Sequence, residues 1–242
     1  MHVACLVHGS VVVHKPHDAL VIFSTYFIGK GSLSRSKPFF MGRELDVKEV
    51  LYLTFEEAFF LMCHEGCLSI LDACSQACSE CISTLSWTDS TDSPRLSSCE
   101  SPTCGVPLSE DQCLSRFCGV RPLFPMQYAV YLRYRLLGWL PRPGHKYGCH
   151  LVLYRQAPHT VHSEFTVLIV DGKDARPLSA QQVQLHVRTS ENTKKKLLLC
   201  YVAEAARTQD GCTTYDFRDV LVERWKVESA ALPATSTCRN AP

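Results

Sequence analysis

Excess charge, long apolar runs and internal repeats are all missing from this 242-residue sequence. Its 25 Lys and Arg residues are balanced by 24 Asp and Glu residues, which leaves a formal net charge of +1. A chain this close to neutral has no bulk attraction to nucleic acid, so any nucleic-acid site must come from local clusters of basic residues. Residues 1–28 are apolar only in patches interrupted by charged and polar residues, which excludes a membrane span there.

The 14 cysteines lack the spacing of a secreted disulfide framework, and we expect no signal peptide. These features predict a soluble protein of a reducing compartment. One group of thiols with a histidine raises the alternative of a structural zinc site: Cys63, His64, Cys67, Cys74, Cys78 and Cys81. Their spacing is mostly helical and offers no second, well-separated ligand pair, so free thiols are the simpler interpretation. We predict no metal and no cofactor.

Two short motifs predict helices with defined starts. In YLTFEEAFFLMCHEGC, Thr54 can cap a helix whose third residue, Glu57, returns the hydrogen bond in a capping box, and Gly66 is placed to end it. The apolar residues of this helix follow helical spacing, which predicts core packing. Ser179 with Gln182 forms a second capping box and predicts a helix there.

The composition divides the chain into segments of different character. Pro125 is well placed in the first turn of a helix over residues 126–137 that Gly138 closes, and a last strand over about residues 215–225 is expected at a sheet edge. The segment before that helix, from residue 83 to about residue 112, is rich in Ser, Thr, Asp and Pro. It can bury too little apolar area to offset the entropy lost on ordering. We predict an α+β fold with a small N-terminal α/β domain (1–82), a flexible Ser-, Cys- and Pro-rich linker or insertion (83–120), a C-terminal domain with a mixed β-sheet flanked by helices (121–228) and a disordered tail (229–242).

Candidate chemistry gathers between residues 145 and 170. This stretch, HKYGCHLVLYRQAPHTVHSEFTVLIV, reads as two alternating strands joined by a Pro-containing loop. Tyr154 is expected to end the first strand on the same face as Val152, and His162 to begin the second. Downstream, the run of lysines 194–196 precedes the apolar segment LLLCYVA, so an ammonium is expected at a strand start nearby. A phenol, an imidazole and an ammonium at one rim of a sheet suggest metal-free cleavage of RNA.

Three segments carry a resemblance to a known family: HKYGCHLVLYR, VHSEFTVLIV and RTSENTKKKLLLCYV. They resemble the catalytic domain of the tRNA-intron (tRNA-splicing) endonucleases, and most closely the eukaryotic catalytic subunit that cuts the 5′ splice site. The resemblance covers roughly residues 125–226. It implies that domain's fold and places the family's catalytic residues at Tyr154, His162 and Lys195, although a one-residue slip would select Lys194 or Lys196 instead.

The reaction that the family catalyses defines a role for each group. A ribose 2′-OH attacks the adjacent phosphorus, leaving a 2′,3′-cyclic phosphate and a 5′-OH. The resemblance implies that Tyr154 takes the 2′ proton, although a free phenol has a pKa of about 10 and is a poor base unless a cation stabilises its phenolate. His162 would protonate the leaving oxygen, because imidazole titrates at about pH 6.5. Lys195 would stabilise charge on the phosphorane.

The resemblance also implies partners and a substrate. In the family, planar or cationic side chains grip a splayed-out bulge base, and Arg188 and Trp225 match those positions. The expected substrate is intron-containing pre-tRNA. The expected assembly is a nuclear heterotetramer with a second catalytic subunit and two structural subunits. One departure is His150, which stands where the family often carries an acidic residue.

Two other functions remain open at this level. A metal-dependent nuclease of the restriction type could use Asp171 and Lys173, which follow a strand in IVDGK, to hold Mg²⁺ and activate water. However, Asp171-Gly172 is also a hairpin-turn signal, and no upstream partner carboxylate is convincing. The chain could instead be a non-catalytic RNA-binding or scaffold subunit, although it retains all three catalytic residue types.

Overall fold

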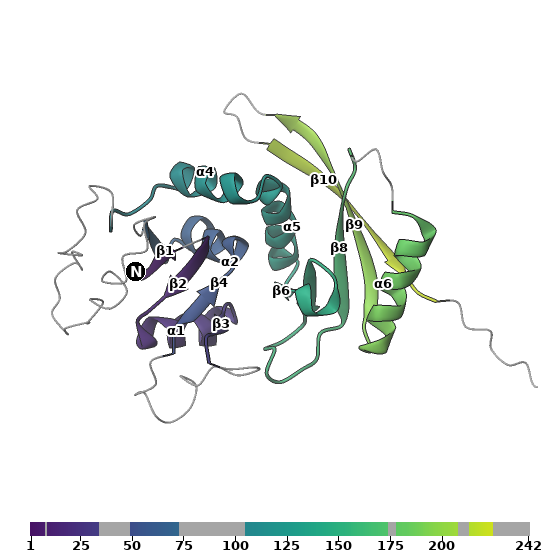
Figure 1. Ribbon diagram of the computed structural model, residues 1–242, viewed down its shortest axis with the longest axis horizontal. Coiled ribbons are helices and arrows are strands. Elements are labelled where there is room, and N and C mark those ends of the chain that lie inside the picture. Colours follow the sequence, from purple (N-terminus) through teal and green to yellow (C-terminus); the bar gives the residue numbers. More distant parts are fainter. Residues whose placement is uncertain (8, 34–48, 73–104, 174–177, 208–212, 225–242) are drawn as a thin grey trace, which may run out of the picture.

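The computed structural model describes residues 1–7, 9–33, 49–72, 105–173, 178–207 and 213–224. They form two five-stranded mixed sheets with helices packed on both (Figure 1). The predicted α+β class is therefore confirmed. We call the described part of residues 1–72 the N-terminal unit and the described part of residues 124–224 the C-terminal unit. No helix in the described ranges has both the length and the apolar character needed to cross a bilayer.

The N-terminal unit is built on a sheet of strand order β3-β4-β2-β1-β5. The β1–β5 pair is parallel and the other pairs are antiparallel. In chain order its elements are β1 (His2–Val7), β2 (Ser10–Val13), α1 (Pro16–Tyr26), β3 (Lys30–Gly31), β4 (Leu51–Leu53), α2 (Phe55–Phe59), the π-helix η2 (Phe60–His64) and β5 (Leu68–Asp72).

Helix α2 begins where the capping box predicts. The Thr54 hydroxyl accepts a hydrogen bond from the amide of Glu57 (3.2 Å), and the Glu57 carboxylate accepts one from the amide of Thr54 (2.9 Å). The helix continues through η2, and the chain turns at Gly66, whose φ of 61° lies in the left-handed region. Phe55 and Phe59 are buried, so the apolar stripe is core, as predicted.

Helix α4 (Glu110–Val120) corrects part of the predicted linker. A capping box between Ser109 and Gln112 starts it, and its Phe117 is fully buried and stacks on Phe55 with ring centroids 4.3 Å apart. Residues 110–120 therefore belong to the folded core, because their few apolar residues fall on one face of a helix. Residues 83–104 of the predicted linker lie outside the described part of the chain, and the other predicted boundaries stay predictions.

The C-terminal unit is built on a sheet of order β10-β9-β8-β7-β6. The β8–β9 pair is parallel and is connected through α6, whereas the remaining pairs are antiparallel. Its elements are α5 (Phe124–Leu136), β6 (Leu140–Pro143), the 3₁₀-helix η3 (His145–Tyr147), β7 (Leu151–Tyr154), β8 (Phe165–Asp171), α6 (Ala180–Asn192), β9 (Lys196–Arg207) and β10 (Thr213–Val222).

The helices of this unit start where the sequence predicts. Helix α5 carries Pro125 in its first turn and is followed by Gly138 at φ 82°. Helix α6 begins with the Ser179–Gln182 capping box. Figure 1 shows α6 on the outer face of the sheet and α5 on the face towards the N-terminal unit. Strand β10 lies at the sheet edge, as expected, and the described part of the chain ends at Arg224.

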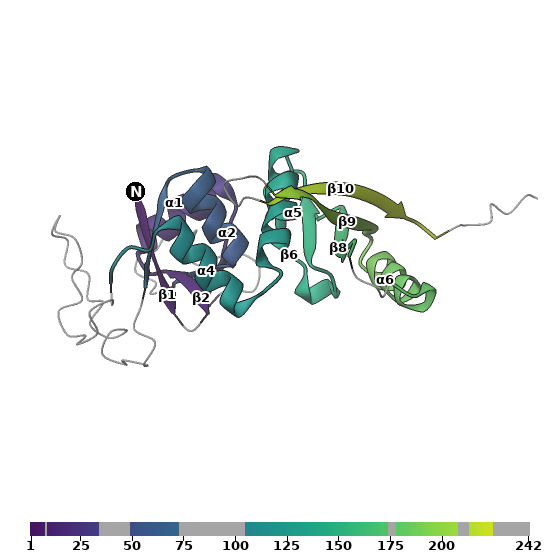
Figure 2. The same cartoon turned by 90° about the horizontal axis from the view of Figure 1, so that it is seen from above.

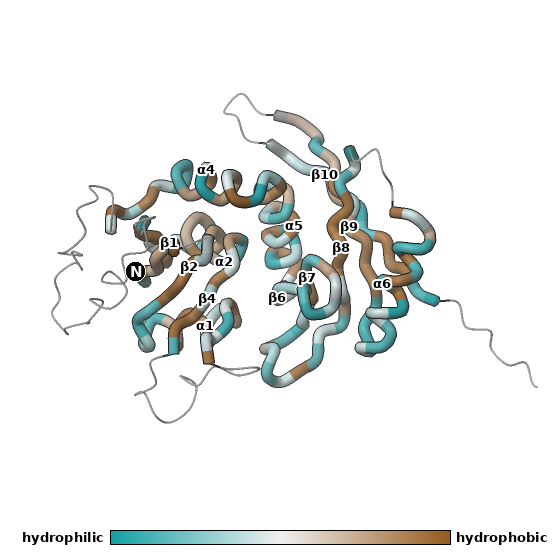
Figure 3. The backbone as a smooth tube through the Cα atoms, in the orientation of Figure 1, coloured by the Kyte–Doolittle hydropathy of each residue, from teal (hydrophilic) through white to brown (hydrophobic). Residues whose placement is uncertain are grey.

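Side chains of the C-terminal sheet divide between two apolar clusters. Leu151 and Leu153 of β7 join the large core that also contains α5, α4 and the N-terminal sheet, whereas Val152 packs on the α6 side. This division follows from the alternation of side chains along a strand. Figure 3 shows the hydrophobic character concentrated along β8 and β9, between the two layers of helices.

The N-terminal unit lies beside α5 and β6 of the C-terminal unit (Figure 2). Arginine side chains tie the two units together there. Arg142 of β6 donates hydrogen bonds to the carbonyls of Phe27 and Gly29 and lies 3.8 Å from the buried carboxylate of Glu57. Arg135 of α5 donates to the carbonyl of Tyr26 at 3.0 Å. Helix α5 and strand β6 are thus anchored to the N-terminal unit.

Candidate active site

Tyr154 is the last residue of β7, and its half-buried side chain packs on the α6 side of the sheet with Val152. Its backbone pairs with Leu140 of β6. The prediction that Tyr154 ends a strand and shares a face with Val152 is confirmed by this geometry. Its phenol is therefore presented at the point where β7 passes into the loop that leads to β8.

Backbone hydrogen bonds align the end of β7 with the starts of β8 and β9. The amide of Glu164 donates to the carbonyl of Leu153 at 2.9 Å, and the amide of Lys196 donates to the carbonyl of Glu164 at 2.9 Å. Tyr154, Glu164 and Lys195 therefore lie at neighbouring positions, where β7 ends and β8 and β9 begin.

Only one of the three consecutive lysines is buried. Lys195 is 9% exposed, whereas Lys194 and Lys196 are exposed, and Lys196 pairs with Glu223 at 2.7 Å. Lys194 adopts a φ of 57°, and the amide of Lys195 closes the end of α6 by donating to the carbonyl of Ser190 at 2.9 Å. This tight turn between α6 and β9 directs the middle side chain inwards.

The ammonium of Lys195 has neutral neighbours. Its Nζ donates to the carbonyl of Thr193 at 3.0 Å and lies 4.7 Å from the ring centroid of Tyr147. Within the described ranges, no carboxylate lies at ion-pair distance from it. Burial lowers its pKa, an effect that the nearby Cys149 opposes. Burial raises the pKa of the Cys149 thiol to about 11, so this thiol is uncharged near neutrality and does not neutralise the lysine.

Tyr147 connects the lysine to Tyr154. Its half-buried side chain packs in the same α6-side cluster as Tyr154. Burial and the neighbouring Tyr154 and Cys149 side chains raise the pKa of the Tyr147 phenol. The structure thus brings the Lys195 ammonium and two phenols together on one face of the sheet.

The structure places His162 differently from the prediction. Strand β8 begins at Phe165, so His162 lies in the preceding loop and is exposed. The hydrogen bonds between β8 and β7 begin only at Glu164, whose amide donates to the carbonyl of Leu153. In the loop before it, the amide of Thr160 donates instead to the carbonyl of Ala157. His162 makes no hydrogen bond, ion pair or ring contact with any described residue.

A comparison with known protein families gives a match over this part of the chain. The model of the tRNA intron endonuclease catalytic C-terminal domain matches residues 124–215, from α5 into β10. Through this domain, the chain belongs to the tRNA intron endonuclease family.

Several tRNA-splicing endonuclease subunits are similar to this family member. It is 30% identical over 190 residues to subunit Sen2 of Mus musculus, covering 73% of this chain and 35% of the mouse protein. It is 28% identical over 204 residues to subunit Sen2-1 of Arabidopsis thaliana, covering 81% of this chain and 73% of the plant protein. Against subunit SEN2 of Saccharomyces cerevisiae it is 30% identical over 117 residues, or 42% of this chain and 30% of the yeast protein. The chain thus spans about a third of the mouse relative's length.

The predicted base-binding pair of the endonuclease domain is only partly described. Arg188 is exposed on α6 and lines a cavity of about 190 Å³ together with Gln184, Val187, Glu223 and Arg224. Trp225 lies outside the described residues, directly after Arg224. The cavity opens beside the helix that ends at the Lys195 turn.

Two residues near Lys195, Tyr147 and Cys149, were not predicted from the sequence to belong to the candidate site. The signal that could have drawn attention to them is the pair of glycines around them. Gly148 has a φ of 65°, and a Cβ at Gly144 would lie 2.4 Å from the Cys149 sulfur, so both positions require glycine for this turn.

The rival metal-site residues are engaged in other contacts. Asp171 accepts a hydrogen bond from the amide of Lys173 at 2.9 Å, and the Lys173 ammonium pairs with Glu204. The Asp171-Gly172 signal corresponds to a turn, but this turn leads from β8 towards α6 and does not form a hairpin. Among the described residues, no group of three or more His, Cys, Asp or Glu side chains converges. Cys63 and Cys67 are free thiols, whereas Cys74, Cys78 and Cys81 lie outside the described ranges.

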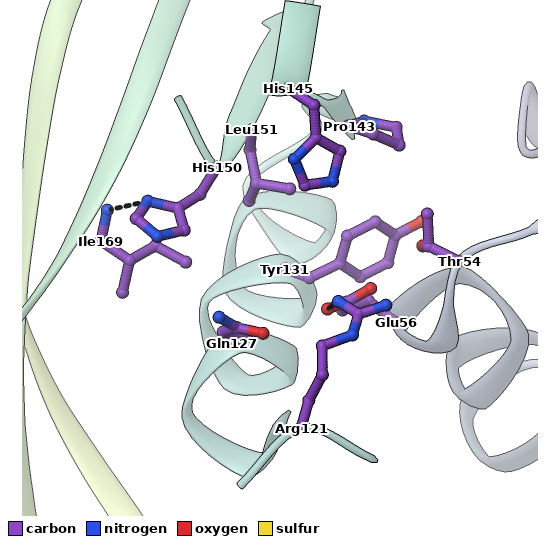
Figure 4. Close-up of a pocket in the computed structure, with 10 residues that line it drawn as sticks. All are labelled: Thr54, Glu56, Arg121, Gln127, Tyr131, Pro143, His145, His150, Leu151 and Ile169. Carbon is purple, nitrogen blue, oxygen red and sulfur yellow. Dashed lines mark hydrogen bonds and ion pairs between the residues drawn. The ribbon is translucent and has the colours of Figure 1, made fainter. Parts of the chain in front are cut away.

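A separate cavity of about 50 Å³ lies between α5, the η3 turn and the N-terminal unit (Figure 4). His145 and His150 line it from the C-terminal unit, and Thr54 and Glu56 line it from the N-terminal unit. His150 Nδ1 accepts a hydrogen bond from the amide of Ile169 at 3.1 Å. The residue that departs from the family pattern therefore still provides an acceptor for a β8 amide.

Proposed function

We propose that this chain is the catalytic subunit of a tRNA-splicing endonuclease that cuts intron-containing pre-tRNA at the 5′ splice site. The observation that carries the proposal is the environment of Lys195, which is buried, has no carboxylate partner among the described residues and lies on the same sheet face as Tyr154. A buried cation without a counterion costs stability, and such groups cluster at functional sites. The site lies within the matched catalytic domain.

The first step is attack of the ribose 2′-oxygen on the neighbouring phosphorus. Tyr154, as its phenolate, accepts the 2′ proton while the new P–O2′ bond forms. The Lys195 ammonium stabilises the extra negative charge that develops on the phosphorane oxygens. Because its neighbours are a carbonyl and a ring, its charge is available to the substrate.

The second step is departure of the 5′-oxygen. The P–O5′ bond breaks, the leaving oxygen takes a proton from the His162 imidazolium, and a 2′,3′-cyclic phosphate and a 5′-OH result. The exposed position of His162 on the β7–β8 loop supports this role, because the imidazole can reach a bound RNA and recover its proton from solvent. No step in this scheme needs a metal ion or other cofactor.

Substrate binding and assembly complete the proposal. Arg188 and Trp225 would hold an unpaired base of the substrate between planar faces, which suits the exposed faces of a bulged nucleotide. We further propose that the chain works in the nucleus within a heterotetramer containing a second catalytic subunit and two structural subunits. The matching relatives are named as subunits, which supports an assembly.

The decisive experiment is cleavage of an intron-containing pre-tRNA by the full chain assembled with its partner subunits in excess EDTA. We expect cutting at both splice sites. The 5′ exon released by the upstream cut should end in a 2′,3′-cyclic phosphate. His162→Ala and Lys195→Ala should each abolish the 5′ cut and leave the 3′ cut. Cutting that requires Mg²⁺ and fails in Asp171→Asn would favour the metal-dependent nuclease, and unchanged 5′ cutting by both variants would identify a scaffold subunit.

A further inference from the structure

The turn before β7 holds an aromatic ring against the lysine proposed for catalysis. The Tyr147 ring centroid lies 4.7 Å from Lys195 Nζ, within the range at which an ammonium is attracted by the face of an aromatic ring. The tyrosine also packs beside Tyr154. Tyr147 therefore contacts Lys195 and lies beside Tyr154. Both of these residues are expected to act on the substrate.

This ring is fixed in place by a closed network of short-range bonds. The amide of Tyr147 donates to the carbonyl of Gly144 at 2.8 Å, and the amide of Gly144 donates to the carbonyl of His150 at 3.0 Å. The buried thiol of Cys149 approaches the carbonyls of Gly144 (3.4 Å) and Leu151 (3.3 Å). These bonds fix the backbone of Tyr147, and its ring packs on the α6-side apolar cluster.

The chemistry of the two contacts explains why a ring suits this place. The Thr193 carbonyl and the Tyr147 ring both attract the ammonium, yet neither carries a net charge. A carboxylate in either position would hold the lysine equally well but would neutralise the charge that a phosphorane needs. A ring and a carbonyl orient the ammonium and keep it fully available.

We infer that Tyr147 is a positioning residue, whose ring face holds the Lys195 ammonium charged and directed towards Tyr154. The inference rests on the proposed function, since it assigns a role in the same reaction. It concerns the ring face and not the hydroxyl, so it separates Tyr147 from the proton-transfer role proposed for Tyr154. Tyr147 is half-buried and packs on the apolar cluster that contains Val152, so it could also serve only to fill space there. A space-filling role and a positioning role predict different effects of substitution.

The test compares variants at position 147 in the full chain assembled with its partner subunits. Cleavage of pre-tRNA at the 5′ site is measured under single-turnover conditions, with the enzyme in excess over the RNA and its concentration varied up to saturation. Tyr147→Phe keeps the ring face and should cut at the wild-type rate within about twofold. Tyr147→Leu should cut roughly 2- to 30-fold more slowly at saturation, the range of a cation–π contact expressed as a rate, with the half-saturating enzyme concentration unchanged. Tyr52→Leu, at an exposed tyrosine of the N-terminal sheet, is the matched control and should behave as wild type.

A pH profile and a fluorinated series distinguish positioning from packing. The ring stabilises the ammonium, so its loss should move the alkaline limb of the Tyr147→Leu profile to lower pH. Phenylalanine with one, two or five ring fluorines at position 147 weakens the ring's attraction for a cation with little change of shape, and the rate should fall stepwise along the series. This series remains informative even if Tyr147→Leu does not fold.

Each outcome supports or overturns the inference. Equal rates across the fluorinated series, or a Tyr147→Phe chain as slow as Tyr147→Leu, would overturn it, the second result by assigning the effect to the hydroxyl. Failure of the proposed function looks different, because Lys195→Ala would then cut as fast as wild type. A slow Lys195→Ala chain with a fast Tyr147→Leu chain would retain the function and reject the role of the ring.

Discussion

Replacing Lys195 with methionine should make the folded chain more stable while it removes activity. Lys195 is 9% exposed, and the described residues offer its ammonium no counterion, so folding transfers a charge from water into a site that only partly compensates it. Methionine has a similar length and no charge. Because the Thr193 carbonyl and the Tyr147 ring recover part of the cost, we expect a gain of about 0.5 to 1 kcal/mol in the free energy of unfolding at pH 7, at the lower end of the range for such changes.

The pH dependence of this gain follows from the direction of the pKa change. Burial lowers the pKa of Lys195 in the folded chain below its ordinary value of 10.5. As pH rises through this lowered pKa, the folded chain loses the proton before the unfolded chain does, so the wild type gains stability up to about pH 10.5. The advantage of Lys195→Met over the wild type should therefore be largest near pH 7 and shrink as the pH rises.

Urea denaturation at pH 7 and at pH 9.5 provides the assay, with Lys196→Met as the control. Lys196 is exposed and forms a surface ion pair with Glu223, so its replacement should change the free energy of unfolding by less than about 0.5 kcal/mol. A Lys195→Met chain that is less stable than wild type at pH 7 would refute the reasoning. It would show that the ammonium contributes net stability and is not a strained catalytic charge.

Three further changes test other parts of the fold. Arg142→Met should lower the free energy of unfolding by about 3 kcal/mol, because the buried Glu57 carboxylate loses its cation, as urea denaturation would show. Phe117→Ala should cost about 3 to 5 kcal/mol in the same assay, because it empties a fully buried site. Gly144→Ala should lower the melting temperature and slow cleavage, because its Cβ would lie 2.4 Å from the Cys149 sulfur.

Matched variants make these outcomes interpretable. Arg116→Met removes an exposed arginine that pairs with Asp72, and it should change stability by less than about 1 kcal/mol. Leu123→Ala removes an exposed side chain between α4 and α5 and should be close to neutral. A Phe117→Ala chain as stable as Leu123→Ala would contradict the assignment of α4 to the core. A Gly144→Ala chain with wild-type cleavage and melting would contradict the tight packing of the turn.

The sequence predicted the elements whose signals are local. A capping box is complete within four residues, so Thr54 with Glu57 and Ser179 with Gln182 identified the starts of α2 and α6. The alternation of Leu151, Val152, Leu153 and Tyr154 predicted which face each side chain occupies. These predictions succeeded because the residues concerned form their decisive contacts with near neighbours in the chain.

The features that were missed depend on distant partners. Helix α4 has a capping box, but its window is polar on average, and its stability comes from Phe117 stacking on Phe55, more than sixty residues earlier. His162 alternates correctly for a strand, yet the ladder begins only at Glu164, where the β7 partner is available. The contact between Tyr147 and Lys195 joins two turns that no local pattern relates.

The large apolar cluster has a consequence for anyone who would excise the endonuclease domain. Its members run from Ala4 in β1 to Val202 in β9, so both sheets share one interior. A truncated chain starting at Phe124, where the family match begins, would expose the α5 surface that now faces Phe55 and Phe59 and would leave Arg142 without its acceptors. The boundary at which similarity to the family begins is therefore not a place where the folded chain can be divided.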